Sequence, residues 1–368
     1  MRAVRETMNT TPAPRPERVP ALDLLRFLAA FGVMLYHYVS HRPAADGGTS
    51  FMATVTQQGY LGVDVFFMIS GFVILWSASG RSATGFVRAR ILRLYPEFWL
   101  AMLITAGALY VLAGAGRHID VVQLIGNATM LPQYVGVEMI DGVYWTLAVE
   151  IKFYALVWLL IVSRQISRLE IALYLWLAAT AVAETIDVGG IIRSVIVFPY
   201  GAHFAAGGFF YRVYESGWTR GRAIALAVAL PLCVVSSVSQ IDQFVDVNRI
   251  TMGMKIATAA VLSAAFVCFA LLRRLQSIRW PAGVALAGAL TYPLYLTHNV
   301  GKAIFLQHLD TVRLWERTLI AILFSLVLAW VVMWTAKRFI APALRWVLNA
   351  FRLKDKPLGK PVTQDGAK

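Results

Sequence analysis

The sequence predicts an all-α integral membrane protein, a bundle of about ten transmembrane helices with both termini in the cytoplasm. Three observations predict this fold class. Of the 368 residues, 58% are hydrophobic and only 15% are charged, and the mean hydropathy is +0.64; soluble domains carry about 25% charged residues. Apolar runs long enough to cross a bilayer recur along the chain. Finally, Lys and Arg are unequally divided between the two sets of connections that separate these runs.

The apolar runs define the predicted transmembrane helices. In chain order they cover residues 22–40, 59–79, 94–115, 143–163, 169–186, 193–211, 222–239, 251–272, 283–306 and 317–341. Prolines inside some of these runs are tolerated because neighbouring helices can satisfy the freed backbone groups. The long connection 116–142 contains the moderately apolar stretch VVQLIGNATMLPQY. The sequence leaves open whether this stretch lies at the membrane interface or re-enters the bilayer.

The positions of Lys and Arg predict the orientation. With the N-terminus inside, 24 of the 34 Lys and Arg residues lie in cytoplasmic segments and six in external ones, as the positive-inside rule requires. We therefore expect a transmembrane domain at 21–348 between cytoplasmic tails at 1–20 and 349–368. The start of the chain lacks a signal-peptide layout, so the first run is expected to remain as a span. The net charge of +14 follows from this topology and needs no nucleic-acid partner.

Two cysteines, Cys233 and Cys268, both lie inside apolar runs. Their positions give neither a disulfide framework nor the spacing of a metal site. They are best explained as small, buried hydrophobic side chains. We expect no bound metal.

The first run contains Arg26 and His37, which are separated by 11 residues. On an α-helix this separation places both side chains on nearly the same face, roughly 16 Å apart along the axis. Ionisable groups within lipid are costly, so two on one face indicate a polar interior. Arg26 could instead extend to the headgroups. For His37 the intramembrane position favours a functional role over a merely satisfied interior histidine.

Other ionisable residues are predicted in the outer halves of their helices: Asp64 in the second run, Glu150 in the fourth and His298 in the ninth. Each could be structural, but an intramembrane ionisable group is a functional candidate by default. His203, near the middle of the sixth run, is equally compatible with packing and with function. A histidine beside a carboxylate is a usual general base for a hydroxyl.

Arg88, Arg90 and Arg93 cluster in the cytoplasmic connection before the third run. On number alone they are ordinary positive-inside residues. Alternatively they form a phosphate clamp, because the planar guanidinium binds phosphate oxygens in pairs. Together with Arg26 they predict a basic inner mouth. A polar pathway would connect this mouth with the outer acid/base cluster around His37.

The motifs, taken together, resemble those of the acyltransferase-3 family of bacterial membrane acyltransferases. The matching pieces, in order, are the Arg26 to His37 pair, GVDVFFMISGF at 62–72, RILRLYPEFW at 90–99, WTLAVEIKFY at 145–154 and YPLYLTH at 292–298. The resemblance covers about residues 22–345. It implies a bundle of ten or so helices that transfers acyl groups, most often acetyl from acetyl-CoA, to sugar hydroxyls of glycans.

The resemblance also implies residue roles. It makes His37 catalytic, with Arg26 supporting that site and the arginines of RILR contacting the coenzyme phosphates. Some family members carry an additional extracytoplasmic hydrolase-like domain, from which this chain departs. Either the membrane domain completes the transfer alone or a separate extracytoplasmic partner does.

These observations predict an O-acyltransferase of the bacterial inner membrane. His37 is the expected general base or transient acyl carrier, and Glu150, Asp64 and His298 are candidates for orienting it or the acceptor. Arg26, Arg90 and Arg93 are expected to bind acyl-CoA. The other expected partners are a carbohydrate or glycolipid acceptor and the lipid bilayer.

Two functions remain as alternatives. A transporter or flippase of a glycolipid or other amphiphile would also need intramembrane charges, but the chain shows no internal repeat. A non-enzymatic membrane scaffold would tolerate apolar replacements of those charges.

Overall fold

The structure of this chain is a computed structural model that describes residues 18–40, 55–113, 119–244, 250–306 and 312–351. Within these ranges the chain is helical and contains no strand. The helices are α1 (Pro20–Leu35), α3 (Gly62–Ala78), α4 (Ala83–Ala113), α5 (Val121–Ala128), α6 (Trp145–Val162), α7 (Leu169–Thr185), α8 (Gly189–Val195), α9 (Gly201–Ser216), α10 (Arg220–Val238), α11 (Ile241–Phe244), α12 (Met252–Ala270), α13 (Leu272–Leu275), α14 (Ala282–Gly301), α15 (Leu314–Thr335) and α16 (Ala341–Ala350).

Eight helical stretches of the described residues are long and apolar enough to cross a membrane. They are Pro20–Ser40, Val55–Ala78, Ala83–Leu112, Gly142–Val162, Ile166–Thr185, Arg220–Gln243, Met252–Ala270 and Leu314–Ala350. The all-α multi-pass membrane class is therefore confirmed. The predicted runs 193–211 and 283–306 are not among the eight, so the count of about ten spans stays a prediction.

The predicted run 193–211 is wrong as a single helix. The helical path ends with α8 at Val195 and resumes with α9 at Gly201, and Pro199 lies in the break. Proline removes a backbone donor and clashes with the preceding turn, so a helix tends to break there unless its neighbours compensate. The remaining helix, α9, has 16 residues, fewer than the ~20 that a perpendicular span needs.

The third and tenth runs also differ from their predicted bounds. α4 begins at Ala83, so Arg88, Arg90 and Arg93 lie within a continuous helix and not in a connection before it. After α15, one π-helical turn at Ala336–Ile340 leads directly into α16. Arg88 Nη1 donates to Asn349 Oδ1 at 2.7 Å, which joins the start of α4 to the end of α16.

The connection after α4 folds back against that helix. Trp99 Nε1 donates to the carbonyl of Ala128 at 3.0 Å, and the Tyr95 hydroxyl donates to that of Thr129 at 3.2 Å. The buried Asn127 side chain donates to the carbonyl of Glu138 and accepts from the Ile140 amide. These hydrogen bonds fix a short helix and turns beside the bundle.

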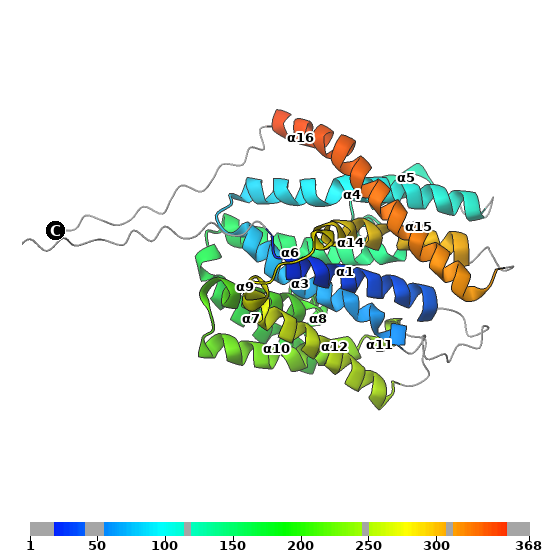
Figure 1. The fold of residues 1–368 in the computed structure, drawn as a ribbon. Helices are drawn as coiled ribbons and strands as arrows, with labels where there is room; N and C mark the ends of the chain where they lie inside the picture. The colour runs from blue at the N-terminus through cyan, green and yellow to red at the C-terminus, as the bar shows by residue number, and fades with distance from the viewer. Residues whose placement is uncertain (1–17, 41–54, 114–118, 245–249, 307–311, 352–368) are drawn as a thin grey trace, which may run out of the picture.

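α3 is the central helix of the bundle. Figure 1 shows α1, α3 and α14 in the middle, between a side made by α4, α15 and α16 and a side made by α10 and α12. α3 packs most extensively against α9, and it also contacts α1 and α6. Most of its residues are buried in consequence, Asp64 included. Two of its polar residues bond neighbouring helices: Asp64 accepts from Ser237 on α10, and Ser70 donates to Glu150 on α6.

Two glycines permit the close approach of α3 and α9. A Cβ atom at Gly71 would overlap the carbonyl oxygen of Phe204, and one at Gly207 would overlap that of Met68. Small residues at such positions let transmembrane helices pack backbone to backbone. This contact holds α3 in the position from which its other face reaches the cavity described below.

Gly207→Ala is expected to lower the apparent melting temperature or abolish recovery of folded protein. Overpacking typically costs about 1–3 kcal/mol of stability, and the overlapped backbone atoms cannot adopt another rotamer to make room. The measurement is thermal unfolding of the purified protein in detergent. Gly107→Ala on α4 is the matched control, since an added Cβ there meets nothing within 4 Å. Equal stability of the two variants would show that α3 and α9 do not pack as described.

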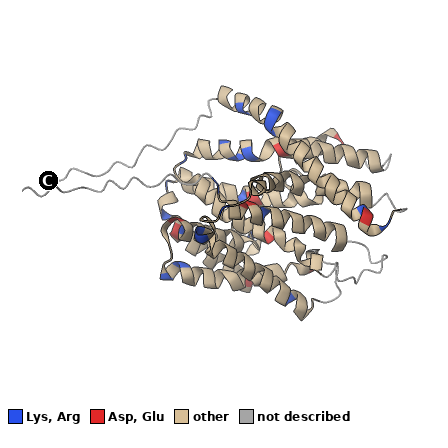
Figure 2. Cartoon of the chain, in the orientation of Figure 1, with Lys and Arg blue, Asp and Glu red and all other residues tan. Residues whose placement is uncertain are grey.

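The distribution of charge agrees with the predicted topology without determining it. Figure 2 shows Lys and Arg on the ribbon in the first part of α4, at the start of α10, and within and just before α16. Arg18 Nη2 donates to the Ala285 carbonyl at 3.3 Å, which places the starts of α1 and α14 side by side. The assignment of this end of the bundle to the cytoplasm stays a prediction.

Candidate functional site

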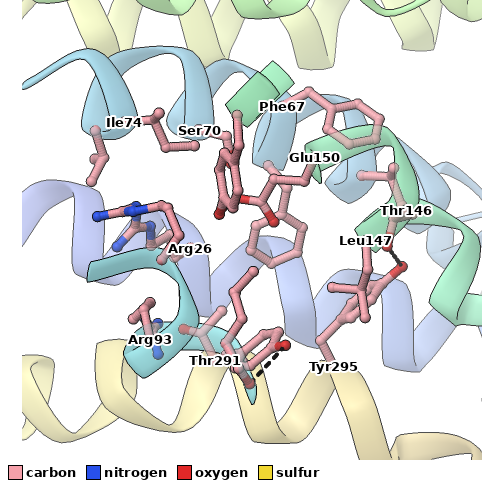
Figure 3. Close-up of a pocket in the computed structure, with 17 residues that line it drawn as sticks. Arg26, Phe67, Ser70, Ile74, Arg93, Thr146, Leu147, Glu150, Thr291 and Tyr295 are labelled. Carbon is pink, nitrogen blue, oxygen red and sulfur yellow. Dashed lines mark hydrogen bonds between the residues drawn. The ribbon is translucent and has the colours of Figure 1, made fainter. Parts of the chain in front are cut away.

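A cavity of about 260 Å³ lies among α1, α3, α4, α6 and α14 (Figure 3). Its wall on α3 runs from Val63 to Ile74, which corresponds to roughly 16 Å of helix. The cavity is therefore elongated along the helix axes. Four of the residues predicted from the sequence line it: Arg26, Arg90, Arg93 and Glu150.

Arg90 lies at the end of the cavity formed by α4. Its guanidinium carbon is 5.6 Å from the ring centroid of Phe86 and 5.6 Å from that of Tyr154. Its Nε atom is buried and has no hydrogen-bond partner among the described residues. A buried donor without an acceptor is uncommon in folded proteins. The two rings hold the guanidinium in place while its polar atoms remain available.

Arg93 lies one turn further along α4, and Figure 3 shows it at the same end of the cavity as Arg26. Its side chain is 45% exposed, so this end is accessible from outside the bundle. Its Nη1 atom is 3.5 Å from Glu97 Oε2, and its guanidinium stacks 5.4 Å from the centroid of Tyr292. The long distance to Glu97 indicates a weak ion pair.

The positive charge of the three arginines is only weakly compensated by nearby carboxylates. Within the described ranges, no carboxylate hydrogen-bonds Arg26 or Arg90, and Glu97 contacts Arg93 only at 3.5 Å. Asp23 and Glu150 act on the cluster through longer-range electrostatic interactions. Guanidinium groups that converge on a cavity and have unsatisfied donors fit an anion with several oxygens, above all a phosphate. The residues present thus fit the phosphates of a coenzyme A thioester, with the elongated cavity available for an apolar arm.

Glu150 lies in the middle of the cavity wall. Its Oε1 atom accepts hydrogen bonds from the Ser70 hydroxyl at 2.9 Å and the Tyr154 hydroxyl at 2.7 Å. Tyr154 lies one turn after Glu150 on α6, and Ser70 reaches it from α3. No described residue donates to Oε2 of Glu150. A carboxylate held in this way has a fixed orientation at the cavity wall.

Tyr295 and Thr146 close the other end of the cavity (Figure 3). Their hydroxyl oxygens are 2.9 Å apart, and each is 3.1 Å from the carbonyl oxygen of Val143. The Tyr295 ring packs edge to face against Phe66, with centroids 5.7 Å apart. These contacts place the aromatic ring across the end of the cavity that is farthest from the arginines.

The two histidines of the predicted site come together beyond Tyr295. The ring centroids of His37 and His298 are 5.1 Å apart, and the His298 ring is 5.9 Å from that of Tyr295. Neither histidine is among the residues that line the cavity. The predicted polar pathway from Arg90 and Arg93 to His37 is therefore interrupted at Tyr295 in this structure.

The hydrogen bonds of His298 fix its tautomer. Its Nδ1 atom is 2.8 Å from the carbonyl oxygen of Tyr295, which can only accept, so Nδ1 carries the proton in the neutral ring. Nε2 then has a lone pair. This atom is buried and has no hydrogen-bond partner among the described residues. A completely buried imidazole with one nitrogen oriented and the other free has the arrangement expected of a base.

Irregular helix geometry surrounds this pair. His37 lies in a π-helical turn at Tyr36–Ser40, and another π-helical turn at Lys302–Leu306 follows α14 directly. The Tyr38 hydroxyl donates to the His298 carbonyl at 2.6 Å and is 2.7 Å from Ser325 Oγ. Such turns are frequent at functional sites. Here they fix the positions of the two imidazoles.

Asp64 lies in a different cluster from the histidine pair. Ser237 Oγ donates to Asp64 Oδ2 at 3.1 Å and is 3.2 Å from His203 Nε2, which is itself 3.7 Å from Asp64 Oδ1. All three side chains are buried between α3, α9 and α10. In the described part of the chain, Asp64 has no contact with His37 or His298 and does not line the cavity. The expectation that it orients either one has no support from this geometry.

Sequence reasoning missed several polar residues at the site. Tyr154 could have been recognised, because it lies four residues after Glu150 on a helix and must share its face. Thr146 shares that face as well. Tyr38 and Ser325 gave no signal, since isolated hydroxyl groups in apolar runs are common. Their importance depends on contacts between segments far apart in the sequence.

The chain is similar to a known family and to known proteins. The model of the acyltransferase-3 family, described as an acyltransferase domain, matches residues 19–334. Acyltransferase MdmB of Streptomyces mycarofaciens is 27% identical over 314 residues, which are 77% of this chain and 79% of that protein. No solved structure matches the chain.

Two further relatives are similar over shorter stretches. The exopolysaccharide production protein ExoZ of Rhizobium meliloti (strain 1021) is 28% identical over 191 residues, 48% of this chain and 57% of that protein. Nodulation protein 10 of Rhizobium leguminosarum bv. viciae is 30% identical over 153 residues, 36% and 41% of the two chains. The family match covers both the cavity and the histidine pair.

Proposed function

We propose, from the premise that this chain belongs to the acyltransferase-3 family, that it is an O-acyltransferase of the bacterial inner membrane. It transfers an acyl group, acetyl in the simplest case, from cytoplasmic acyl-CoA to a hydroxyl group of a glycan or glycosylated acceptor. The observation that carries the proposal is the elongated cavity with three arginines at one end and a hydrogen-bonded carboxylate in its middle.

Arg26, Arg90 and Arg93 bind the donor through its phosphates. Their unsatisfied donors and weakly compensated charge support this role, because a phosphate can accept paired hydrogen bonds from a planar guanidinium. The apolar and aromatic wall beyond them accommodates the arm that carries the thioester. This end of the cavity faces the cytoplasm in the predicted topology, where acyl-CoA is found.

His37 and His298 act at the acceptor end. The lone pair on His298 Nε2 and the contact between the His298 and His37 rings support a shared role for the two histidines in removing a proton from the acceptor hydroxyl. His37 is the general base or a transient acyl carrier. Transfer requires the acyl group to reach the acceptor across Tyr295, so this side chain must move during the reaction.

The acceptor class rests on the names of relatives. ExoZ is described as an exopolysaccharide production protein and MdmB as an acyltransferase. A carbohydrate hydroxyl is the acceptor consistent with both. For this chain we propose a sugar hydroxyl on a polysaccharide, a lipid-linked glycan or a glycosylated small molecule.

The direct test is release of free CoA from acetyl-CoA by the purified protein, together with its thermal stability in the presence of CoA. A ligand at 100 times its Kd stabilises the folded state by about 2.7 kcal/mol, so a clear upward shift of the melting temperature is expected. The proposal is overturned if CoA neither stabilises the protein nor is released from acetyl-CoA, with or without a glycan acceptor.

A further inference from the structure

The hydroxyl of Ser70 has the environment of a nucleophile. It lines the cavity from the middle of α3 and donates its hydrogen bond to Glu150 Oε1 at 2.9 Å. We propose that Ser70 receives the acyl group from acyl-CoA before the group passes to the final acceptor. Glu150 is the base of this step, and Tyr154 positions Glu150. The inference rests on the proposed acyltransferase function and deepens it.

Ser70 differs from the other serine and threonine side chains of the cavity wall. Thr291 donates to the Ala287 carbonyl of its own helix at 3.2 Å, and Thr146 is bonded to Val143 and Tyr295. Among the described cavity-lining residues, only Ser70 offers an aliphatic hydroxyl whose proton points at a carboxylate. A hydroxyl is a weak nucleophile until an adjacent base activates it.

The Ser70–Glu150 pair also has an orienting group and a nearby cation, as an acyl-transfer site requires. The Tyr154 hydroxyl donates to the same oxygen of Glu150 at 2.7 Å and fixes the carboxylate. Arg26 lies close enough to Glu150 for electrostatic interaction, and Figure 3 shows it at the same cavity as Ser70 and Glu150. While its donors hold the phosphates, the positive charge of Arg26 would favour the negative oxygen of a tetrahedral intermediate through longer-range electrostatics.

The first step forms a serine ester. The Ser70 Oγ atom attacks the thioester carbon while its proton moves to Glu150. An oxygen–carbon bond forms, the carbon–sulfur bond breaks, and the thiolate leaves with the electron pair of that bond and takes a proton from water. In the second step an acceptor hydroxyl attacks the ester carbon and gives its proton to His37. The Ser70 oxygen leaves as the product ester forms, and it recovers its proton from Glu150.

This order accounts for a feature that direct transfer leaves unexplained. The arginine-lined cavity ends at Tyr295, and His37 and His298 lie beyond it. An ester on Ser70 holds the acyl group inside the cavity after the thiol has left. Movement of Tyr295 can then admit the acceptor without the donor being present at the same time.

The test is detection of the ester in full-length protein. Purified wild type is mixed with acetyl-CoA without acceptor, denatured at acid pH, and analysed by intact mass spectrometry and peptide mapping. We expect one acetyl group on the peptide containing Ser70, stable at neutral pH after denaturation, as an oxygen ester is and an acyl-imidazole is not. Ser70→Ala is expected to lose this adduct and about 100-fold or more in acetyl transfer, and to bind CoA like wild type.

Ser77→Ala is the matched control on the same helix. Its hydroxyl donates to the Ile74 carbonyl and does not line the cavity, so adduct and turnover should be those of wild type. Ser70→Cys provides a second test if the alanine variant does not fold, since a thiol there should give a thioester adduct that hydroxylamine cleaves quickly.

The failures of the two proposals are distinguishable. An acetyl group mapped to His37, or normal turnover by Ser70→Ala, overturns the role of Ser70 and leaves the acyltransferase function intact. Absence of CoA release by wild type overturns the acyltransferase function itself.

Discussion

Replacing His37 with alanine is expected to reduce acetyl transfer to an acceptor by a factor of about 10² to 10⁴, the range that general bases contribute. Affinity for CoA should stay near that of wild type, because His37 does not line the arginine-containing cavity. The measurements are acceptor acetylation by mass spectrometry and CoA binding by thermal shift. The two readouts separate loss of chemistry from loss of donor binding.

A companion variant tests whether the two histidines act as one unit. His298→Asn retains an amide that can donate to the Tyr295 carbonyl, as Nδ1 does at 2.8 Å. It has no atom equivalent to Nε2. Its loss of transfer should be comparable to that of His37→Ala, and the double variant should be little worse than either single one, since residues that act together are not additive.

Multiplicative losses in the double variant would show two independent roles. Wild-type transfer by His37→Ala would remove the histidine pair from the mechanism. The second result would leave the arginine-lined cavity as a binding site without the acceptor end proposed for it.

Much of the arrangement of the candidate site was predictable from helical periodicity. The separation of Arg26 and His37 indicates a shared face of α1, and the structure places both on the inner side of the bundle, one at the cavity and one at the histidine pair. His298 was predicted at a similar depth. The predicted topology assigns each residue a depth in the membrane. His37 and His298 were predicted to belong to one cluster because their predicted depths are similar.

The sequence did not predict which neighbouring helix Asp64 faces. α3 is buried on nearly every side, so its apolar pattern does not indicate which neighbour each residue faces. Asp64 and Val63 are adjacent in sequence, but Val63 lines the cavity and Asp64 faces His203 and Ser237. The partners come from α9 and α10, and no spacing in the sequence connects them with α3.

The second large effect is expected at the donor end. Arg90→Ala should raise the KM for acetyl-CoA about 10- to 100-fold with little change in kcat, because hydrogen bonds to charged groups contribute about 1.5–3 kcal/mol. The KM of Arg90→Lys should fall between those of wild type and Arg90→Ala, since an ammonium keeps the charge but not the paired donors. Steady-state release of CoA measures both constants.

Arg88→Ala is the matched control on the same helix. Arg88 bonds the Asn349 side chain on α16 and does not line the cavity, so its loss should change KM less than twofold, within the small effect usual for exposed charges. If Arg88→Ala and Arg90→Ala raise KM equally, the basic character of this end of the bundle acts as a whole and no clamp exists.

A substrate without phosphates shows which part of the donor Arg90 contacts. S-acetyl-pantetheine carries the thioester and the arm of acetyl-CoA but lacks its nucleotide phosphates, so wild type should use it poorly. Arg90→Ala should then lose little further activity with it, because the interaction removed by the mutation is already missing from the substrate. An equal loss with both donors would place Arg90 at the thioester or in the fold of the cavity and not at the phosphates. The outcome also bears on Arg93, whose long contact with Glu97 leaves it free to contribute to the same clamp.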